Sequence, residues 1–144
     1  MNFINEYKYI VIPVSIWILI QLFKFFSDMV RTKQFDFSRL IGAGGMPSAH
    51  SAVVTSLAAL IGKNEGINSP LFGIAVCFAC IVMYDATGVR RAAGEQAKVL
   101  NKIVQTADIA HFKNEKKLVE VLGHTPLQVL IGATIGIFWG VFLG

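Results

Sequence analysis

The chain has 144 residues, of which 54% are hydrophobic and only 15% are charged. This balance excludes an ordinary soluble domain and predicts membrane segments within a single domain, residues 1–144. The formal net charge of +4 is modest, so we expect no nucleic-acid partner, and the placement of the charges matters more than their sum.

Four apolar stretches follow one another along the chain. They run from Tyr9 to about Phe26, from about Pro47 to Gly62, from about Pro70 to Tyr84, and from Thr125 to Gly144. The last reaches the roughly 20 residues that a membrane-spanning helix needs. The others are shorter and fit tilted spans or partly buried helices. Because charges or helix-ending residues bound each stretch, we predict an all-α polytopic membrane bundle of about four spans.

The connection between the third and fourth stretches carries a further helical pattern. From Val89 to Val104 apolar residues recur at helical spacing, charged residues lie on the other side, and Thr87 is a candidate N-cap. The pattern predicts an amphipathic helix that lies on the membrane surface or covers a site. A solvated charged face fits most of the same charges.

The basic residues are distributed unevenly. Eleven of the thirteen Lys and Arg residues fall in two connections, residues 24–45 and 85–123. With four spans these connections share one face, which the positive-inside rule makes cytoplasmic. We therefore expect a protein of the inner cell membrane with a basic cytoplasmic face.

Cys77 and Cys80 form a C-x-x-C pair inside the third apolar stretch. No second pair and no nearby histidine completes a ligand set, so we interpret both as small buried side chains and expect no metal.

Gly44-Gly45-Met46-Pro47-Ser48-Ala49-His50 precedes the second apolar stretch. Two glycines permit an unusual turn, and proline suits the first turn of a helix. A helix N-terminus on the basic face binds phosphate well, with Ser48 as a hydroxyl donor and His50 as a proton carrier. A simple helix start with an interfacial histidine explains the segment equally well.

Gly123-His124-Thr125-Pro126 repeats this arrangement before the fourth stretch. Two histidines at helix starts on one face can serve as nucleophile or base and as general acid. The third histidine, His111, lacks these features and is interpreted as a surface residue.

Basic residues near these starts are candidate phosphate ligands, because phosphoryl transfer needs several cations. They are Lys24, Arg31, Arg90 and Arg91. Snorkelling at the membrane boundary also explains Lys24. A role in setting topology explains Arg91 equally well.

At this point the chain resembles a known superfamily, type 2 phosphatidic acid phosphatase and vanadium haloperoxidase. Lys24-x6-Arg31 followed by Pro47-Ser48-Ala49-His50 is similar to its first two signatures. The strings GGMPSAHSA, DATGVRRAAGEQAKVLN and LGHTPLQV resemble its divergent, compact branch. The resemblance implies His124 as nucleophile, His50 as general acid, and phosphate held by Lys24, Arg31, Ser48 and Arg90, with no cofactor.

The chain departs from the superfamily pattern at several positions. Thr32 replaces proline, Ala49 replaces glycine, and Leu118 stands where an arginine is usual. Gln128 stands where a carboxylate usually supports the nucleophile. An amide orients an imidazole but stabilises its cation less well, and Asp85 is the candidate substitute carboxylate.

The leading hypothesis is therefore a membrane lipid phosphatase acting on a phosphomonoester or diphosphate such as phosphatidylglycerophosphate or phosphatidate. The alternative is a non-enzymatic membrane protein that binds anionic lipids or acts in transport. Gly132, Gly136 and Gly140 recur every four residues on the last helix. They suit either a homodimer or packing within one chain.

Overall fold

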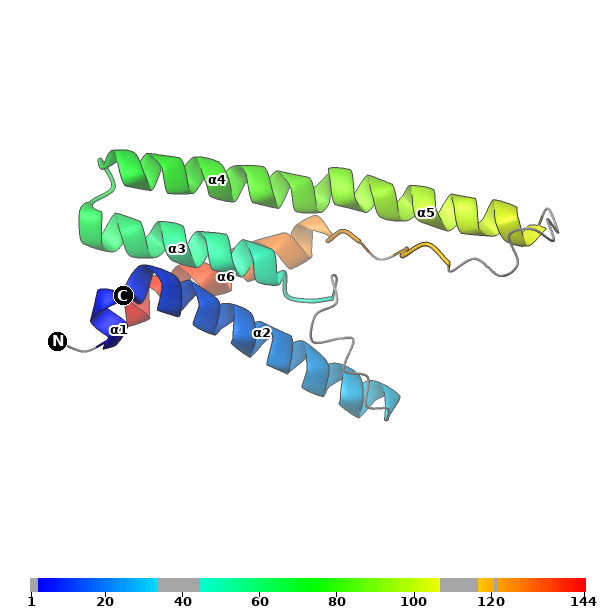
Figure 1. The fold of residues 1–144 in the computed structure, drawn as a ribbon, viewed down its shortest axis with the longest axis horizontal. Coiled ribbons are helices and arrows are strands. Elements are labelled where there is room, and N and C mark those ends of the chain that lie inside the picture. Colours follow the sequence, from blue (N-terminus) through cyan, green and yellow to red (C-terminus); the bar gives the residue numbers. More distant parts are fainter. Residues whose placement is uncertain (1–2, 34–44, 107–116, 121) are drawn as a thin grey trace.

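The computed structural model describes residues 3–33, 45–106, 117–120 and 122–144. Within these ranges all regular structure is helical, which confirms the predicted all-α class (Figure 1). The helices are α1 (Phe3–Glu6), α2 (Lys8–Thr32), α3 (Ala49–Glu65), α4 (Pro70–Thr87), α5 (Val89–Thr106) and α6 (Pro126–Leu143).

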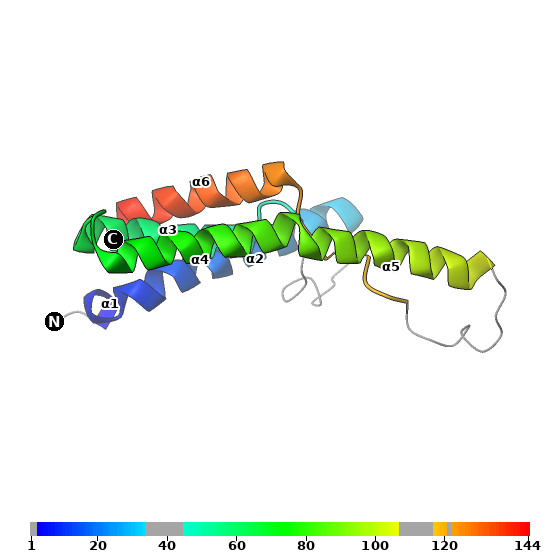
Figure 2. The ribbon, with the colours of Figure 1, turned by 90° about the horizontal axis from the view of Figure 1, so that it is seen from above.

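Helix α3 lies at the centre of the bundle. It packs against α2, α4 and α6, and its contact with α6 is the most extensive in the molecule. Figure 1 shows α3 between α4 and α2, and Figure 2 shows α6 running beside it. Its buried residues are mostly small, including Ala49, Ala52, Ser51 and Ser56, so three helices approach it closely.

Three helical stretches are long and apolar enough to cross a membrane: α2, α4 with its continuation α5, and α6. Large apolar side chains on these helices face outward, among them Phe23, Ile74, Phe78, Ile81, Leu130 and Phe138. An exposed surface of this kind suits lipid rather than water. Helix α3 has 17 residues, and its neighbours surround it. It therefore completes the bundle without needing a lipid-facing apolar surface.

The glycines of α6 lie inside the chain. A methyl group at Gly132, Gly136 or Gly140 would overlap the backbone oxygen of Ser48, Ala52 or Ser56 on α3. Thr55 adds a hydrogen bond from its Oγ1 to the carbonyl of Ala133 at 3.0 Å. Of the two roles that the sequence left open, the structure shows packing within one chain, in which these glycines meet α3.

The amphipathic helix exists but does not fold over the bundle end. Only Gly88 separates α4 from α5, and its N–H donates to Tyr84 at 2.8 Å while its carbonyl accepts from Ala92 at 2.9 Å. Because helical hydrogen bonds continue through this residue, α5 extends nearly in line with α4 beyond the bundle (Figure 1). Thr87 does not cap α5, since its hydroxyl bonds back to Met83 at 3.1 Å.

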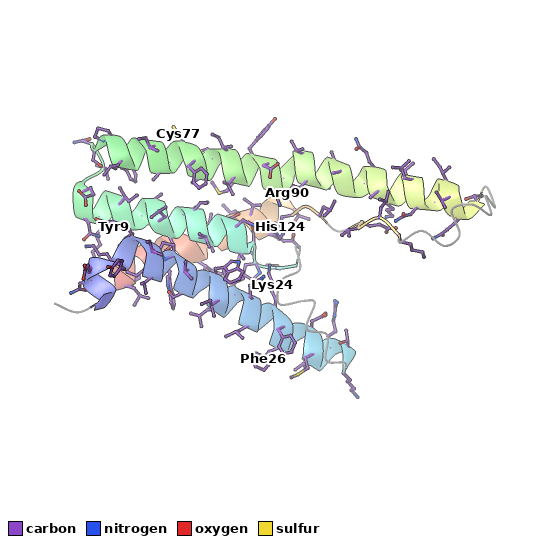
Figure 3. The ribbon with its side chains drawn as sticks, viewed as in Figure 1. Tyr9, Lys24, Phe26, Cys77, Arg90 and His124 are labelled. Carbon is purple, nitrogen blue, oxygen red and sulfur yellow. The ribbon has the colours of Figure 1, made fainter. Side chains whose placement is uncertain are left out.

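The prediction that Cys77 and Cys80 are buried is wrong, because both thiols are exposed and free. Helix α4 buries Ala75, Ala79 and Ala86 instead. Figure 3 shows Cys77 on the outer side of α4.

Candidate functional site

Three helix ends meet at one end of the bundle: the starts of α3 and α6 and the end of α4. Two backbone hydrogen bonds join them, from His124 N–H to Ala86 O at 3.0 Å and from Ser48 N–H to Gln128 O at 3.1 Å. A cavity of about 20 Å³ lies here, with room for about one water molecule. It is lined by His50, Val82, Asp85, Ala86, Arg90, Leu122 and His124. Figure 3 shows Arg90, His124 and Lys24 near this end.

His124 is held immediately before the N-terminus of α6. Gly123 permits this position, because a Cβ there would overlap the backbone of Arg91. Thr125 is the N-cap of α6, and its hydroxyl and the Gln128 side chain form a reciprocal capping box. His124 is buried, with 4% of its surface exposed. The close packing of Gly123 before it and the capping box after it fix its position.

The hydrogen bonds of Gln128 determine which nitrogen of His124 carries the proton. Gln128 Oε1 accepts the Thr125 N–H at 3.0 Å, so this atom is an oxygen and not the amide nitrogen. The same oxygen lies 3.3 Å from His124 Nδ1. Because an amide oxygen can only accept, the neutral imidazole carries its proton on Nδ1. Nε2 is then left with a free lone pair, as a nucleophile requires.

The environment keeps His124 neutral. Burial lowers its pKa from the ordinary value of 6.5, and the positive charges of Lys24 and Arg90, together with His50, lower it further. The hydrogen bond to Gln128 acts in the opposite direction but does not reverse the shift. A lowered pKa leaves the lone pair on Nε2 available at neutral pH.

His50 reaches the same cavity from the first turn of α3. Ser48 is the N-cap of α3, and its Oγ accepts the N–H of Ser51 at 3.4 Å and its hydroxyl at 2.9 Å. Gly45 has a φ of 76°, in the left-handed region that glycine tolerates, as the chain approaches this turn. The two histidines therefore line one cavity from different helices, as the sequence predicts.

Charged groups surround the histidines. Arg90 Nε donates to Asp85 Oδ2, which pairs the second residue of α5 with the last turn of α4. Asp85 thus supports Arg90, while Gln128 holds His124 Nδ1. Lys24 is half-buried on α2, and its side chain passes beside Gly45. Among the described residues, no three His, Cys, Asp or Glu side chains gather in a way that could hold a metal.

Four of the five predicted phosphate ligands, all but Arg90, do not line the cavity, although the charge of Lys24 acts on His124. Ser48 is completely buried, and its hydroxyl serves the cap of α3. Arg31 pairs with Asp28 at 3.2 Å, has an 80% exposed side chain, and lies on the part of α2 that diverges from α3 (Figure 1). Arg91 is exposed and does not line the cavity. His111 lies outside the described residues.

Sequence reasoning missed the capping box that orients His124. A threonine followed three residues later by glutamine, before an apolar run, is a recognised helix-start signature. Thr125 and Gln128 have this spacing. Val82 and Leu122 also line the cavity, but no sequence motif marks them as site residues.

Comparison with known proteins places the chain among related membrane proteins. Residues 5–139 match the model of the Divergent PAP2 family. The chain is also 42% identical to the uncharacterized membrane protein YuiD of Bacillus subtilis, over an alignment that covers 83% of each chain. No solved structure matches the chain.

Proposed function

The chain belongs to the Divergent PAP2 family, and we propose that it is a membrane phosphatase that hydrolyses the phosphate group of a lipid. The observation that carries this proposal is His124, whose Nδ1 is held by Gln128 beside a cavity shared with His50 and Arg90. Such a histidine has the lone pair, and its surroundings the positive charge, that attack on phosphorus requires.

In the proposed reaction, Nε2 of His124 forms a bond to phosphorus as the bond from phosphorus to the ester oxygen breaks. Protonated His50 delivers its proton to the departing oxygen, which leaves as an alcohol. A water molecule, deprotonated by the same His50, then attacks phosphorus and releases inorganic phosphate and free His124. Arg90 and Lys24 balance the charge of the phosphoryl oxygens throughout. The reaction needs neither metal nor cofactor.

The phosphate must displace groups that now fill the site. The cavity of about 20 Å³ holds only about one water molecule, and Arg90 is paired with Asp85. A phosphate oxygen replacing the Asp85 carboxylate on Arg90 would exchange one charge-assisted contact for another. Asp85 therefore acts as the partner that keeps Arg90 in place between turnovers.

We place the site at the cytoplasmic face of the inner membrane, on the strength of the positive-inside rule. The site end of the bundle carries the two connections that hold most of the Lys and Arg residues. A cytoplasmic site favours a phospholipid-synthesis intermediate, such as phosphatidylglycerophosphate or phosphatidate, over a carrier lipid on the far side.

Purified protein in phospholipid nanodiscs, assayed for phosphate release from phosphatidate, phosphatidylglycerophosphate and a polyprenyl diphosphate, tests the proposal. We expect release from at least one lipid, and loss of release in His124→Ala and His50→Ala but not in His111→Ala. Binding of anionic lipids without release from any of the three would favour the non-enzymatic alternative and contradict the proposal.

A further inference from the structure

An open apolar groove runs along the bundle beside the candidate site. It has a volume of about 490 Å³ and lies over α3, between α4 and α6. Ala58 and Ala59 form part of its floor, Val76 and Cys80 one wall, and Ile137 and Val141 the other. Helices α4 and α6 both pack on α3 but touch each other little, so they stand apart as walls.

The hydroxyl of Thr55 and the ammonium of Lys63, which both line the groove, already make hydrogen bonds to backbone carbonyls. Thr55 Oγ1 donates to the carbonyl of Ser51 at 2.7 Å, and Lys63 Nζ donates to the carbonyl of Val141 at 2.9 Å. The remaining lining is aliphatic, aromatic or sulfur-containing. A groove with this lining suits a hydrocarbon chain, because Lys63, at the end away from the histidines, is the only charged residue among those that line it.

The dimensions of the groove fit a lipid tail within one leaflet. Along α4 its lining extends from Phe72 to Met83, which is roughly 17 Å of helix. Half of the hydrocarbon core of a bilayer measures about 15 Å. Phe72 packs against Gly62 at the far end, where a Cβ on the glycine would lie 2.8 Å from the ring. This contact lies toward the end of the groove that is away from the histidines, where Lys63 and Ile67 also line it.

The other end of the groove lies within one turn of α4 from the residues that line the candidate site. Met83 lines the groove, whereas its neighbours Val82, Asp85 and Ala86 line the cavity that holds His50 and His124. One amphiphile can therefore place a phosphate at the histidines while its tail follows α4. The groove is also open to the surrounding lipid, because two of its lining residues lie at the surface. Ile137 is 49% exposed, and Cys80 is exposed.

We propose that this groove seats one hydrocarbon tail of the lipid phosphate whose head group reacts at the histidines. The inference rests on the proposed function, because it is the head group that makes occupancy selective. A tail gains little by leaving lipid for an equally apolar groove. Anchoring of the phosphate by Arg90 and Lys24 holds the tail there.

Photolabelling tests the groove without any turnover. The intact chain is placed in phosphatidylcholine nanodiscs with a phosphonate analogue of phosphatidate that carries a diazirine in mid-tail. The reference lipid is phosphatidylcholine with the same tail. After irradiation, mass spectrometry compares labelling at Val76 and Cys80, in the groove, with labelling at Ile74 and Ile81, which lie outside it on the same helix.

We expect the ratio of groove to outside labelling to be severalfold higher for the phosphonate than for the reference lipid. Equal ratios for the two lipids would overturn the proposal. Phosphate release in the separate activity assay together with equal ratios would refute the groove alone. A raised ratio without phosphate release would refute the phosphatase alone.

Two matched substitutions on α4 test whether filling the groove keeps the lipid tail out. Val76→Trp fills the groove, whereas Ile81→Trp adds the same side chain to the outward surface. We expect Val76→Trp to reduce groove labelling and to raise KM for a long-chain lipid phosphate, but not for a short-chain soluble one. Equal effects of both variants, or oxidative cross-linking between the Cys80 residues of two copies, would contradict a lipid tail as the occupant.

Discussion

Replacing Gln128 by glutamate changes the charge beside the proposed nucleophile while keeping its geometry. A glutamate oxygen at the position of Gln128 Oε1 still accepts the N–H of Thr125, and glutamate suits this position of a capping box. It also places a negative charge about 3.3 Å from His124 Nδ1. An opposite charge at such a distance raises a pKa by about 1 to 3 units.

The sign of the effect on activity follows from the protonation state that attacks. In the wild-type chain the pKa of His124 is lowered from 6.5, so the neutral imidazole persists into mildly acidic solution. Activity is present above this pKa and is lost as the pH falls through it. In Gln128→Glu the carboxylate stabilises the imidazolium, so we expect the acidic limb of kcat/KM to move to higher pH by about 1 to 3 units.

The assay is a pH profile of phosphate release in nanodiscs, accompanied by NMR titration of labelled histidine. Gln96→Glu is the matched control, because Gln96 is exposed on α5 and does not line the cavity. An unmoved acidic limb in Gln128→Glu, or a shift to lower pH, would refute the assignment of Gln128 as the partner of His124.

Three further predictions concern the frame of the site. Gly136→Ala should lower the free energy of unfolding by about 1 to 3 kcal/mol, because the added methyl group overlaps α3. Gly73→Ala is the control, since its methyl group meets open space. Equal melting temperatures of the two variants would argue against the α3–α6 contact. Lys24→Met should weaken substrate binding, seen as a higher KM, whereas Arg31→Met should leave KM nearly unchanged. Gly123→Ala should reduce the kcat of the folded protein, because its Cβ would overlap the backbone of Arg91 and displace the backbone beside His124. Normal kcat would contradict that reasoning.

The bundle and the pairing of His50 with His124 follow from local patterns. Apolar length predicts the outward helices, and Gly and Pro before each histidine mark helix starts at one end. The two histidines meet because α3 and α6 run side by side, which the glycine spacing of α6 permits. The sequence did not reveal that these glycines contact α3 rather than a second chain, because both partners demand the same small residues.

Other features depend on contacts that no local pattern specifies. Ser48 and Arg31 match the expected signatures, yet one caps a helix and the other faces outward with Asp28. The bonds of Ser48 to Ser51 fix the first role, and the divergence of α2 from α3 leaves Arg31 on the outside (Figure 1). In the sequence Thr87 is the candidate N-cap of a separate amphipathic helix, but the helical hydrogen bonds continue through Gly88 and keep α5 in line with α4.

The central claim is that His124 becomes covalently phosphorylated during turnover. The direct measurement is to mix the chain with ³²P-labelled lipid phosphate and to quench the reaction rapidly without acid. Mass spectrometry then identifies the labelled residue, and NMR identifies the nitrogen that carries the phosphoryl group. The account predicts an acid-labile, alkali-stable label on Nε2 of His124, which accumulates in His50→Ala if that variant slows hydrolysis. Phosphate release without any label on His124, or the same label in His124→Ala, would contradict it.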